Sequence, residues 1–385
     1  MGKHSVDNAK SHFAPGTGLS FESEDGEFAL KPRLRAQLRY TLIADEGEES
    51  LQSLQFRRAR LQFKGHTFGK HNKFKVELAI SPRDVGESDS SGPSTSPLLD
   101  WYWTFNYLRD LTLTLGQYKI PHNRQRVVSS GDLQLVDRSI VNSEFTLDRD
   151  IGFDLRSKDL GGLDLLRYYV GVYAGEGRNT REEHDFGLLY LARVEVLPFG
   201  MFDDYQEVDF ERSPTPKLSI GLGYAHLENG RGSRGILGSP PADGGTTDLD
   251  SFTWDLVFRV AGLSVTSEWV LRNGRRNPGD ATQTDDQGNE VAVPTQAPPD
   301  GIGGMLQVGY LFPRTRFEIA ARAGATRRVG DHTSLVEEDE YGGGVSYYFA
   351  QHPFKLQADY FRLGQEIEGG KNFENEARVQ LQVAF

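Results

Sequence analysis

The feature that most constrains this chain is a two-residue alternation of apolar and polar side chains, which recurs from residue 28 almost to the end. The stretch FALKPRLRAQLRYTL at 28–42 carries only apolar side chains and one proline on one face. The other face carries the cations Lys31, Arg33, Arg35 and Arg39. Successive side chains of a strand point to opposite faces, so this stretch is predicted to be a β-strand. Its apolar face could pack in a core, or it could contact lipid while the basic face lines a water-filled lumen.

Sixteen stretches of this kind are predicted to be strands: 28–42, 52–64, 69–81, 98–108, 111–119, 150–156, 164–174, 186–197, 217–228, 250–260, 263–272, 302–312, 315–327, 340–349, 354–364 and 375–385. Many reach the roughly 9–11 residues that a tilted strand needs to cross a bilayer, and no run approaches the roughly 18 apolar residues of a membrane helix. The 43 glycines and the many aromatic residues fit a transmembrane barrel, and they fit a soluble sandwich as well.

The lengths of the connections separate these two folds. Two-residue turns at 109–110 and 261–262 alternate with long polar connections such as 83–97 and 273–301. An up-and-down outer-membrane barrel has short periplasmic turns and long outer loops. We therefore predict an all-β, closed antiparallel transmembrane β-barrel of 16 strands. The connection at 198–216 is long where a short turn is expected, and it is interpreted as an insertion.

The sequences at the two ends of the chain also favour a location in a bacterial outer membrane. Residues 1–27 contain no apolar signal-peptide core, so we expect a mature outer-membrane protein whose signal peptide has been removed. They are predicted to form an N-terminal periplasmic extension outside the strands, followed by a barrel over 28–385. The last stretch alternates and ends in Phe385, which resembles the assembly signal of bacterial outer-membrane proteins. The absence of cysteine fits an oxidising compartment without disulfides.

The cations concentrate on a few neighbouring strands, although the chain has a net charge of −12, which argues against nucleic acid as a partner. The first three predicted strands place about nine cations and one carboxylate on the inner face, and the last strand adds one cation after closure. The predicted anion pathway comprises Lys31, Arg33, Arg35, Arg39, Arg58, Arg60, Lys64, Lys73, Lys75 and Arg378. Crowded like charges repel by about 1 kcal/mol per pair at 4 Å in water, which a permeating anion would offset. Inward carboxylates are expected on later strands at Glu195, Glu268, Glu318 and Asp359. In the alternative interpretation, the charges merely solvate the interior.

Residues 115–155 resemble the phosphate-selective porin O/P family. The shared motifs are GQYKIP at 116–121, paired serines at 129–130, DRS at 137–139 and RDIG at 149–152, and the stretch at 56–65 is similar to the family's second strand. The resemblance implies a sixteen-stranded barrel, usually a homotrimer, whose third loop folds inward and narrows the channel.

The resemblance places this constriction at 120–149, after Pro121 ends the fifth strand. Its candidate charged residues are Lys119, Arg124, Arg126, Asp132, Asp137 and Arg138. The loop carboxylates and the sparse arginines of later strands argue against strict phosphate specificity.

The sequence predicts a channel and not an enzyme. It has no G-x-S-x-G motif and no Gly-rich phosphate loop with Gly-Lys-Ser/Thr, and no cofactor or metal is expected. The predicted function is passive diffusion of small anionic, phosphate-like solutes through an outer-membrane pore. The expected partners are outer-membrane lipid and lipopolysaccharide, small anions and two further copies of the chain. A general or weakly selective porin and a non-conducting structural or adhesive barrel are the alternatives.

Overall fold

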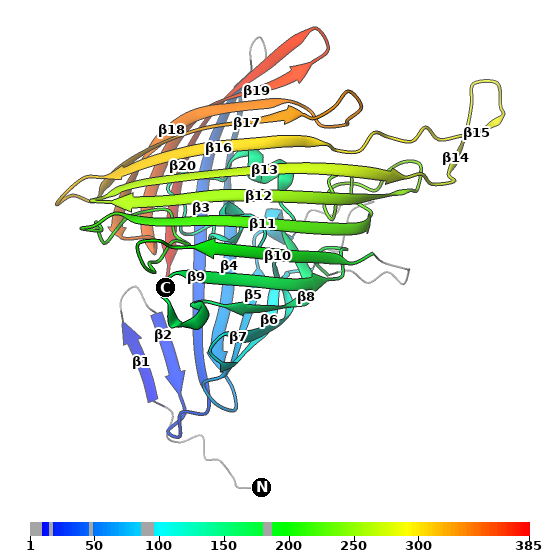
Figure 1. Ribbon diagram of the computed structural model, residues 1–385. Coiled ribbons are helices and arrows are strands. Elements are labelled where there is room, and N and C mark those ends of the chain that lie inside the picture. Colours follow the sequence, from blue (N-terminus) through cyan, green and yellow to red (C-terminus); the bar gives the residue numbers. More distant parts are fainter. Residues whose placement is uncertain (1–9, 15–17, 46–48, 86–95, 180–186) are drawn as a thin grey trace.

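The computed structural model describes the chain except residues 1–9, 15–17, 46–48, 86–95 and 180–186, and its strands surround a single lumen (Figure 1). The barrel strands are β3 (Ala29–Asp45), β4 (Leu51–His66), β5 (Asn72–Ala79), β6 (Leu98–Leu108), β7 (Leu111–Lys119), β8 (Arg149–Ser157), β9 (Leu166–Tyr173), β10 (Leu189–Val196), β11 (Lys217–Gly230), β12 (Thr246–Val260), β13 (Leu263–Asn277), β16 (Gly301–Leu311), β17 (Phe317–Arg328), β18 (Glu338–Ala350), β19 (Phe354–Ile367) and β20 (Gly370–Ala384). Each pairs antiparallel with the next, and β20 closes the sheet on β3. The predicted sixteen-stranded closed barrel is confirmed.

Helices are short and lie in the connections. They are α1 (Pro82–Val85), α2 (Arg124–Val127) and α3 (Ile140–Phe145), with a 3₁₀ turn at Leu160–Gly162. None of the helices in the described part of the chain is long and apolar enough to cross a membrane.

The alternation along β3 places its cations inside the barrel. Arg35 and Arg39 are buried, whereas Leu38 and Tyr40, on the opposite face, are 37% and 39% exposed. The same order holds on β10, where Arg193 is buried between exposed neighbours. The exposed face of the barrel is therefore the apolar one, as lipid contact requires.

A β-bulge in β4 changes the direction of one arginine. Gln37 pairs with Arg58, but the next residue, Leu38, pairs with Phe56, so Arg57 is the extra residue. Strict alternation would place the Arg57 side chain on the outer face. Its guanidinium instead lies 3.6 Å from the Asp84 carboxylate, among the inward-facing charges.

Two hairpins lie outside the barrel wall. The strands β1 (Lys10–Ala14) and β2 (Gly18–Glu22) pair with each other, and β2 also pairs with the start of β3 at Phe21–Leu30. Figure 1 shows this hairpin beyond the barrel, near the C-terminus. The prediction that residues 1–27 lie outside the strands was wrong for 10–14 and 18–22, because five-residue strands show too little alternation to recognise. The second hairpin, β14 (Thr282–Thr284) with β15 (Glu290–Ala292), projects from the opposite end.

The two faces of β3 should differ in their tolerance of charge. We expect Leu38→Lys to lower the free energy of unfolding by about 2–4 kcal/mol, the cost of a cation on the lipid face near the midplane. Thr41→Lys, on the inner face beside a large cavity, should change it by about 0.5 kcal/mol or less. Urea titrations in detergent micelles measure both values. Equal losses in the two variants would contradict this assignment of faces.

Candidate permeation site

The connection between β7 and β8, residues 120–148, lies inside the barrel. The Gln37 amide donates to the Ser130 carbonyl (3.0 Å), the Lys355 ammonium to the Leu133 carbonyl (2.6 Å) and the Arg322 guanidinium to the Asp137 carbonyl (2.9 Å). These donors belong to β3, β19 and β17. Helix α3 also packs against β13, β16, β17 and β18. A segment bonded to inward side chains on so many strands can only occupy the lumen.

Arg124 fastens this loop to the wall formed by β10, β11 and β12. Its guanidinium is 2.6 Å from the Asp204 carboxylate and 3.3 Å from that of Glu195, and it also pairs with Asp255. The Ser219 hydroxyl accepts from it at 2.9 Å. Arg124 was predicted to be a constriction cation, but it is 1% exposed and lines none of the cavities described below. It is a structural anchor instead.

The carboxylates predicted on the later strands also hold the loop. Glu268 accepts from the backbone N–H of Gln125 (2.8 Å), Glu318 from the Gln134 amide (2.7 Å) and Asp359 from the backbone N–H of Val136 (2.9 Å). These carboxylates are buried. The acidic side of the lumen is therefore occupied by the loop and faces little water.

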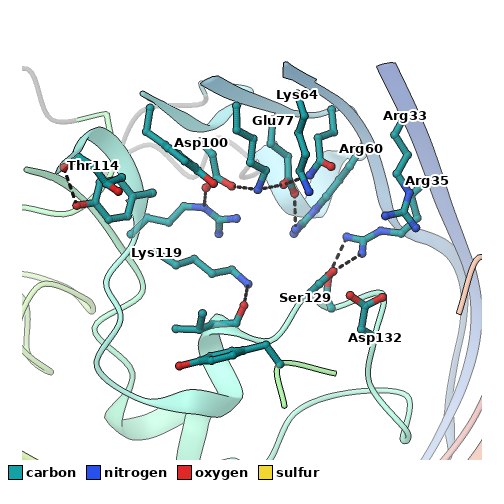
Figure 2. A pocket seen from close by; sticks show the side chains of 18 of the residues that line it. Arg33, Arg35, Arg60, Lys64, Glu77, Asp100, Thr114, Lys119, Ser129 and Asp132 are labelled. Carbon is teal, nitrogen blue, oxygen red and sulfur yellow. Dashed lines mark hydrogen bonds and ion pairs between the residues drawn. The ribbon is translucent and has the colours of Figure 1, made fainter. Parts of the chain in front are cut away.

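Open space remains along β3 to β8, and its outer part extends to residues of β17 to β20. An inner cavity of about 310 Å³ is lined by residues of β3 to β8 and by the loop (Figure 2). Two outer cavities of about 580 and 460 Å³ lie toward the long connections. Arg60, Lys119 and Arg149 line both the inner cavity and the 460 Å³ cavity, and Arg57 and Arg58 line both outer ones. The three cavities thus adjoin, and together they form what we call the basic passage.

Cations outnumber carboxylates around each part of the basic passage. Eight lysines and arginines and three carboxylates line the inner cavity. The 580 Å³ outer cavity has eight cations against four carboxylates, and the 460 Å³ cavity has nine against three. The basic wall predicted from the first strands is therefore continuous through the lumen.

Many cations of the passage are held by carboxylates. Arg39 and Arg58 share Asp137 at 2.9 and 3.0 Å. The other pairs are Arg60 with Glu77 and Asp84, Lys75 with Glu77 and Asp100, Arg126 with Asp148, and Arg378 with Asp359 and Glu376. Burial would raise the pKa of Asp137, but Arg58, Arg39 and Arg57 outweigh it and hold that pKa well below its ordinary range. Asp137 therefore stays ionised and partly neutralises the outer cavity.

Four of the eight cations of the inner cavity lack a carboxylate partner among the described residues: Arg33, Arg35, Lys64 and Lys119. Among the described residues, the Arg35 guanidinium donates only to the hydroxyls of Ser129 (3.0 Å) and Ser130 (2.9 Å). Figure 2 shows Arg35 beside the loop, with Asp132 also at the cavity's edge. The uncompensated positive charge therefore concentrates here.

Two cations of the loop side are held by backbone carbonyls. Lys119 donates to the Arg126 carbonyl (2.7 Å), and Arg138 donates to the carbonyls of Gln125 (2.8 Å) and Val128 (2.6 Å). Carbonyls fix these side chains without cancelling their charge. Lys31 and Lys73, also predicted in the pathway, are exposed and line none of the three cavities.

Six arginines that line the passage were not predicted from the sequence: Arg57, Arg83, Arg149, Arg156, Arg178 and Arg322. Arg57 requires the bulge, which alternation does not reveal. Arg156 follows Asp154 at the two-residue spacing of β8 and lines the inner cavity, so the alternation of 150–156 could have identified it. Arg149 begins β8 and pairs with Asp100 at 2.6 Å. Its place in the RDIG motif was noticed, but its position facing the cavity was not.

Comparison with known proteins gives one family match. Residues 30–200 match the family described as phosphate-selective porin O and P. An uncharacterised protein of Aquifex aeolicus is 25% identical over 224 residues, which is 51% of this chain and 53% of that protein. The chain thus matches about half the length of this curated relative.

Solved structures extend the likeness to nearly the whole chain. The anion-selective porin from Comamonas acidovorans has a TM-score of 0.59 at 14% identity, over 93% of this chain and 100% of that one. A trimer form of OmpT, an outer membrane protein of Vibrio cholerae, has a TM-score of 0.51 at 12% identity, over 92% and 99%. At such identities the likeness shows the fold alone. The chain therefore resembles the phosphate-selective porin O and P family over residues 30–200, and the whole barrel has the fold of a bacterial outer-membrane porin channel.

Proposed function

We propose that this porin lets small anions, including phosphate-like oxyanions, diffuse passively through the basic passage. The observation that carries the proposal is the inner cavity, where eight cations and three carboxylates surround about 310 Å³. A low-dielectric wall focuses such a field and raises the local concentration of anions. At physiological salt the field reaches about 8–10 Å, which is enough to influence a narrow passage.

The donors of the inner cavity suit an oxyanion. Arg35 presents a planar guanidinium, which matches the geometry of phosphate or carboxylate, and Lys64 supplies a point charge. The hydroxyls of Ser129 and Ser130 accept hydrogen bonds from Arg35, and each can donate its own proton to an oxygen of the anion. A chloride ion uses the charge of this site, whereas a phosphate uses both the charge and the hydrogen-bond donors.

A general or weakly selective porin is the second candidate. Asp137, Glu77 and Asp84 neutralise several cations of the passage and weaken discrimination between anions. A non-conducting structural or adhesive barrel would have to close the adjoining cavities. The porin fold and the family match indicate a channel rather than an enzyme.

The assembly and surroundings belong to the same proposal. We infer a homotrimer in the bacterial outer membrane, with lipid and lipopolysaccharide around the apolar outer face and residues 1–27 on the periplasmic side. The trimer form of the structurally similar Vibrio cholerae protein supports the stoichiometry. Mass measurement in mild detergent tests it.

Phosphate should compete with chloride for the passage. Adding phosphate at constant chloride should lower the chloride current and saturate, because an oxyanion bound at Arg35 and Ser129 blocks smaller anions. Single-channel recording in a planar bilayer measures this effect. Replacing both Ser129 and Ser130 by alanine should weaken the block while leaving the chloride current. If the phosphate and chloride currents simply add, the result would support the alternative of a general or weakly selective porin.

A further inference from the structure

The connection between β10 and β11, residues 197–216, is unusual for its place in the barrel. The other connections at that end have two to eight residues, whereas this one has twenty. Asp204, Glu207 and Asp209 within it are 2–4% exposed, and Val208 is fully buried. A solvated insertion would leave its carboxylates in water, so this segment is built into the molecule.

The segment bonds to the 120–148 loop at two places. Asp204 receives the Arg124 guanidinium at 2.6 Å, and that guanidinium lies 4.8 Å from the centre of the Tyr205 ring. Farther along, the backbone N–H of Glu207 donates to the Asp132 carbonyl (3.1 Å), and the Glu207 carboxylate accepts from the backbone N–H of Gln134 (2.8 Å). The loop and the segment, entering from opposite ends, therefore meet inside the lumen.

The segment is also fixed to the barrel wall. Arg259 of β12 donates to the Asp203 carbonyl at 2.6 Å, and Gln307 of β16 donates to Glu207 at 2.9 Å. Val208 packs in an apolar cluster with Leu311 and Tyr348. It thus spans the inner faces of β12 to β18, which is the acidic side of the lumen.

We propose that the 197–216 segment is a second lumen-closing element, which sets ion selectivity by covering the carboxylates of that wall. Glu195, Asp255 and Glu318 are 0–3% exposed beneath the segment and the loop. Tyr205 lines the inner cavity and donates its hydroxyl to Glu195, so it separates this carboxylate from the passage. The ion selectivity of the channel then depends on the buried carboxylates as much as on the cations that line the passage. This inference rests on the proposed anion passage.

Shortening the segment tests the inference. Residues 201–210 are replaced by a Gly-Ser-Gly-Ser turn, and the control variant lacks residues 282–292. The control ends are already adjacent, because the Val293 N–H donates to the Ala281 carbonyl at 2.9 Å. Shortening should raise single-channel conductance severalfold and remove the preference for chloride, because uncovered carboxylates admit potassium. The control should conduct like the parent protein.

A labelling experiment reports closure without reference to selectivity. The chain has no cysteine, and Ser219 is fully buried against Arg124, which the Asp204 carboxylate of the segment also contacts. The thiol introduced by Ser219→Cys should resist a water-soluble thiosulfonate reagent in the full-length chain and react in the shortened one. Should the shortened chain fail to insert, the double variant Asp204→Asn, Glu207→Gln removes the two carboxylate charges that hold the loop at constant length, and it is expected to give changes in the same direction.

The outcomes separate this inference from the proposed function. If the parent protein shows no preference for chloride, the proposed anion passage is wrong. If the Ser219→Cys thiol is nevertheless protected in the full-length chain and reacts after shortening, the closing role of the segment still stands. A chloride-selective parent whose folded, shortened variant keeps its conductance, selectivity and thiol protection overturns the inference alone.

Discussion

Replacing Arg33, Arg35 and Lys64 together by glutamate should invert the charge selectivity of the channel. These residues line the inner cavity and have no carboxylate partner within the described residues. The triple variant leaves five cations against six carboxylates there. Reversing one charge 4 Å from an ion changes their interaction by about 2 kcal/mol in water, and about 1.4 kcal/mol corresponds to a factor of ten. We expect the chloride-to-potassium permeability ratio to fall by about tenfold or more.

The choice of residues and the control make this result specific. Arg58 and Arg60 stay unchanged because they hold Asp137, Glu77 and Asp84. Glutamate at either position would break these ion pairs and destabilise the barrel wall, instead of only changing the charge that lines the passage. The matched control replaces Arg109, Arg275 and Lys371 by glutamate. These residues are exposed and line none of the three cavities. The control changes the net charge equally, so the reversal potential measured in a salt gradient should stay that of the parent. An unchanged chloride-to-potassium permeability ratio in the triple variant would mean that the basic wall does not select ions.

Arg124→Met should destabilise the barrel by about 3 kcal/mol, the lower end of the cost of breaking a buried ion pair. Three buried carboxylates, Glu195, Asp204 and Asp255, lose a partner. The loss is limited because Arg193 still contacts Glu195 and Asp255, while Arg167 still contacts Asp204. Urea unfolding in detergent micelles measures the change.

An exposed arginine is the control for Arg124. The Arg275 side chain is 80% exposed and pairs with Asp248, so Arg275→Met should leave the unfolding midpoint unchanged. We also expect Arg124→Met to raise conductance, because the loop loses its anchor on β10 to β12. Full stability in Arg124→Met would show that the carboxylate cluster does not hold the loop.

The sixteen strands were predictable because lipid outside and water inside impose the same two-residue pattern on each of them. The pattern also identified the inner faces, so Arg35, Arg58 and Glu195 point where alternation places them. The two-residue pattern failed where an extra residue shifts the alternation, as at Arg57 in the bulge of β4. It also failed for β1 and β2, which lie outside the barrel wall and do not separate lipid from water.

The arrangement inside the lumen was not predictable because distant parts of the chain determine it. Arg124 and Lys119 looked equivalent in the sequence of one loop. Arg124 pairs with Asp255, 131 residues away, and is buried, whereas Lys119 lines the passage and, within the residues that the structure describes, bonds only to nearby carbonyls. The long connection predicted at 198–216 was interpreted as an insertion for the same reason, since its partners come from the loop and from β12 to β18.

The reversal potential of the unmodified protein in a potassium chloride gradient shows whether the basic passage favours anions. A planar bilayer with a tenfold gradient needs no variant and no assumption about the identity of the natural solute. We predict a potential of the sign that marks chloride as the more permeant ion, and we expect this preference to weaken as added salt screens the charges of the passage. A potential that marks potassium as the more permeant ion would contradict the proposed anion passage, because its cations would then not govern permeation.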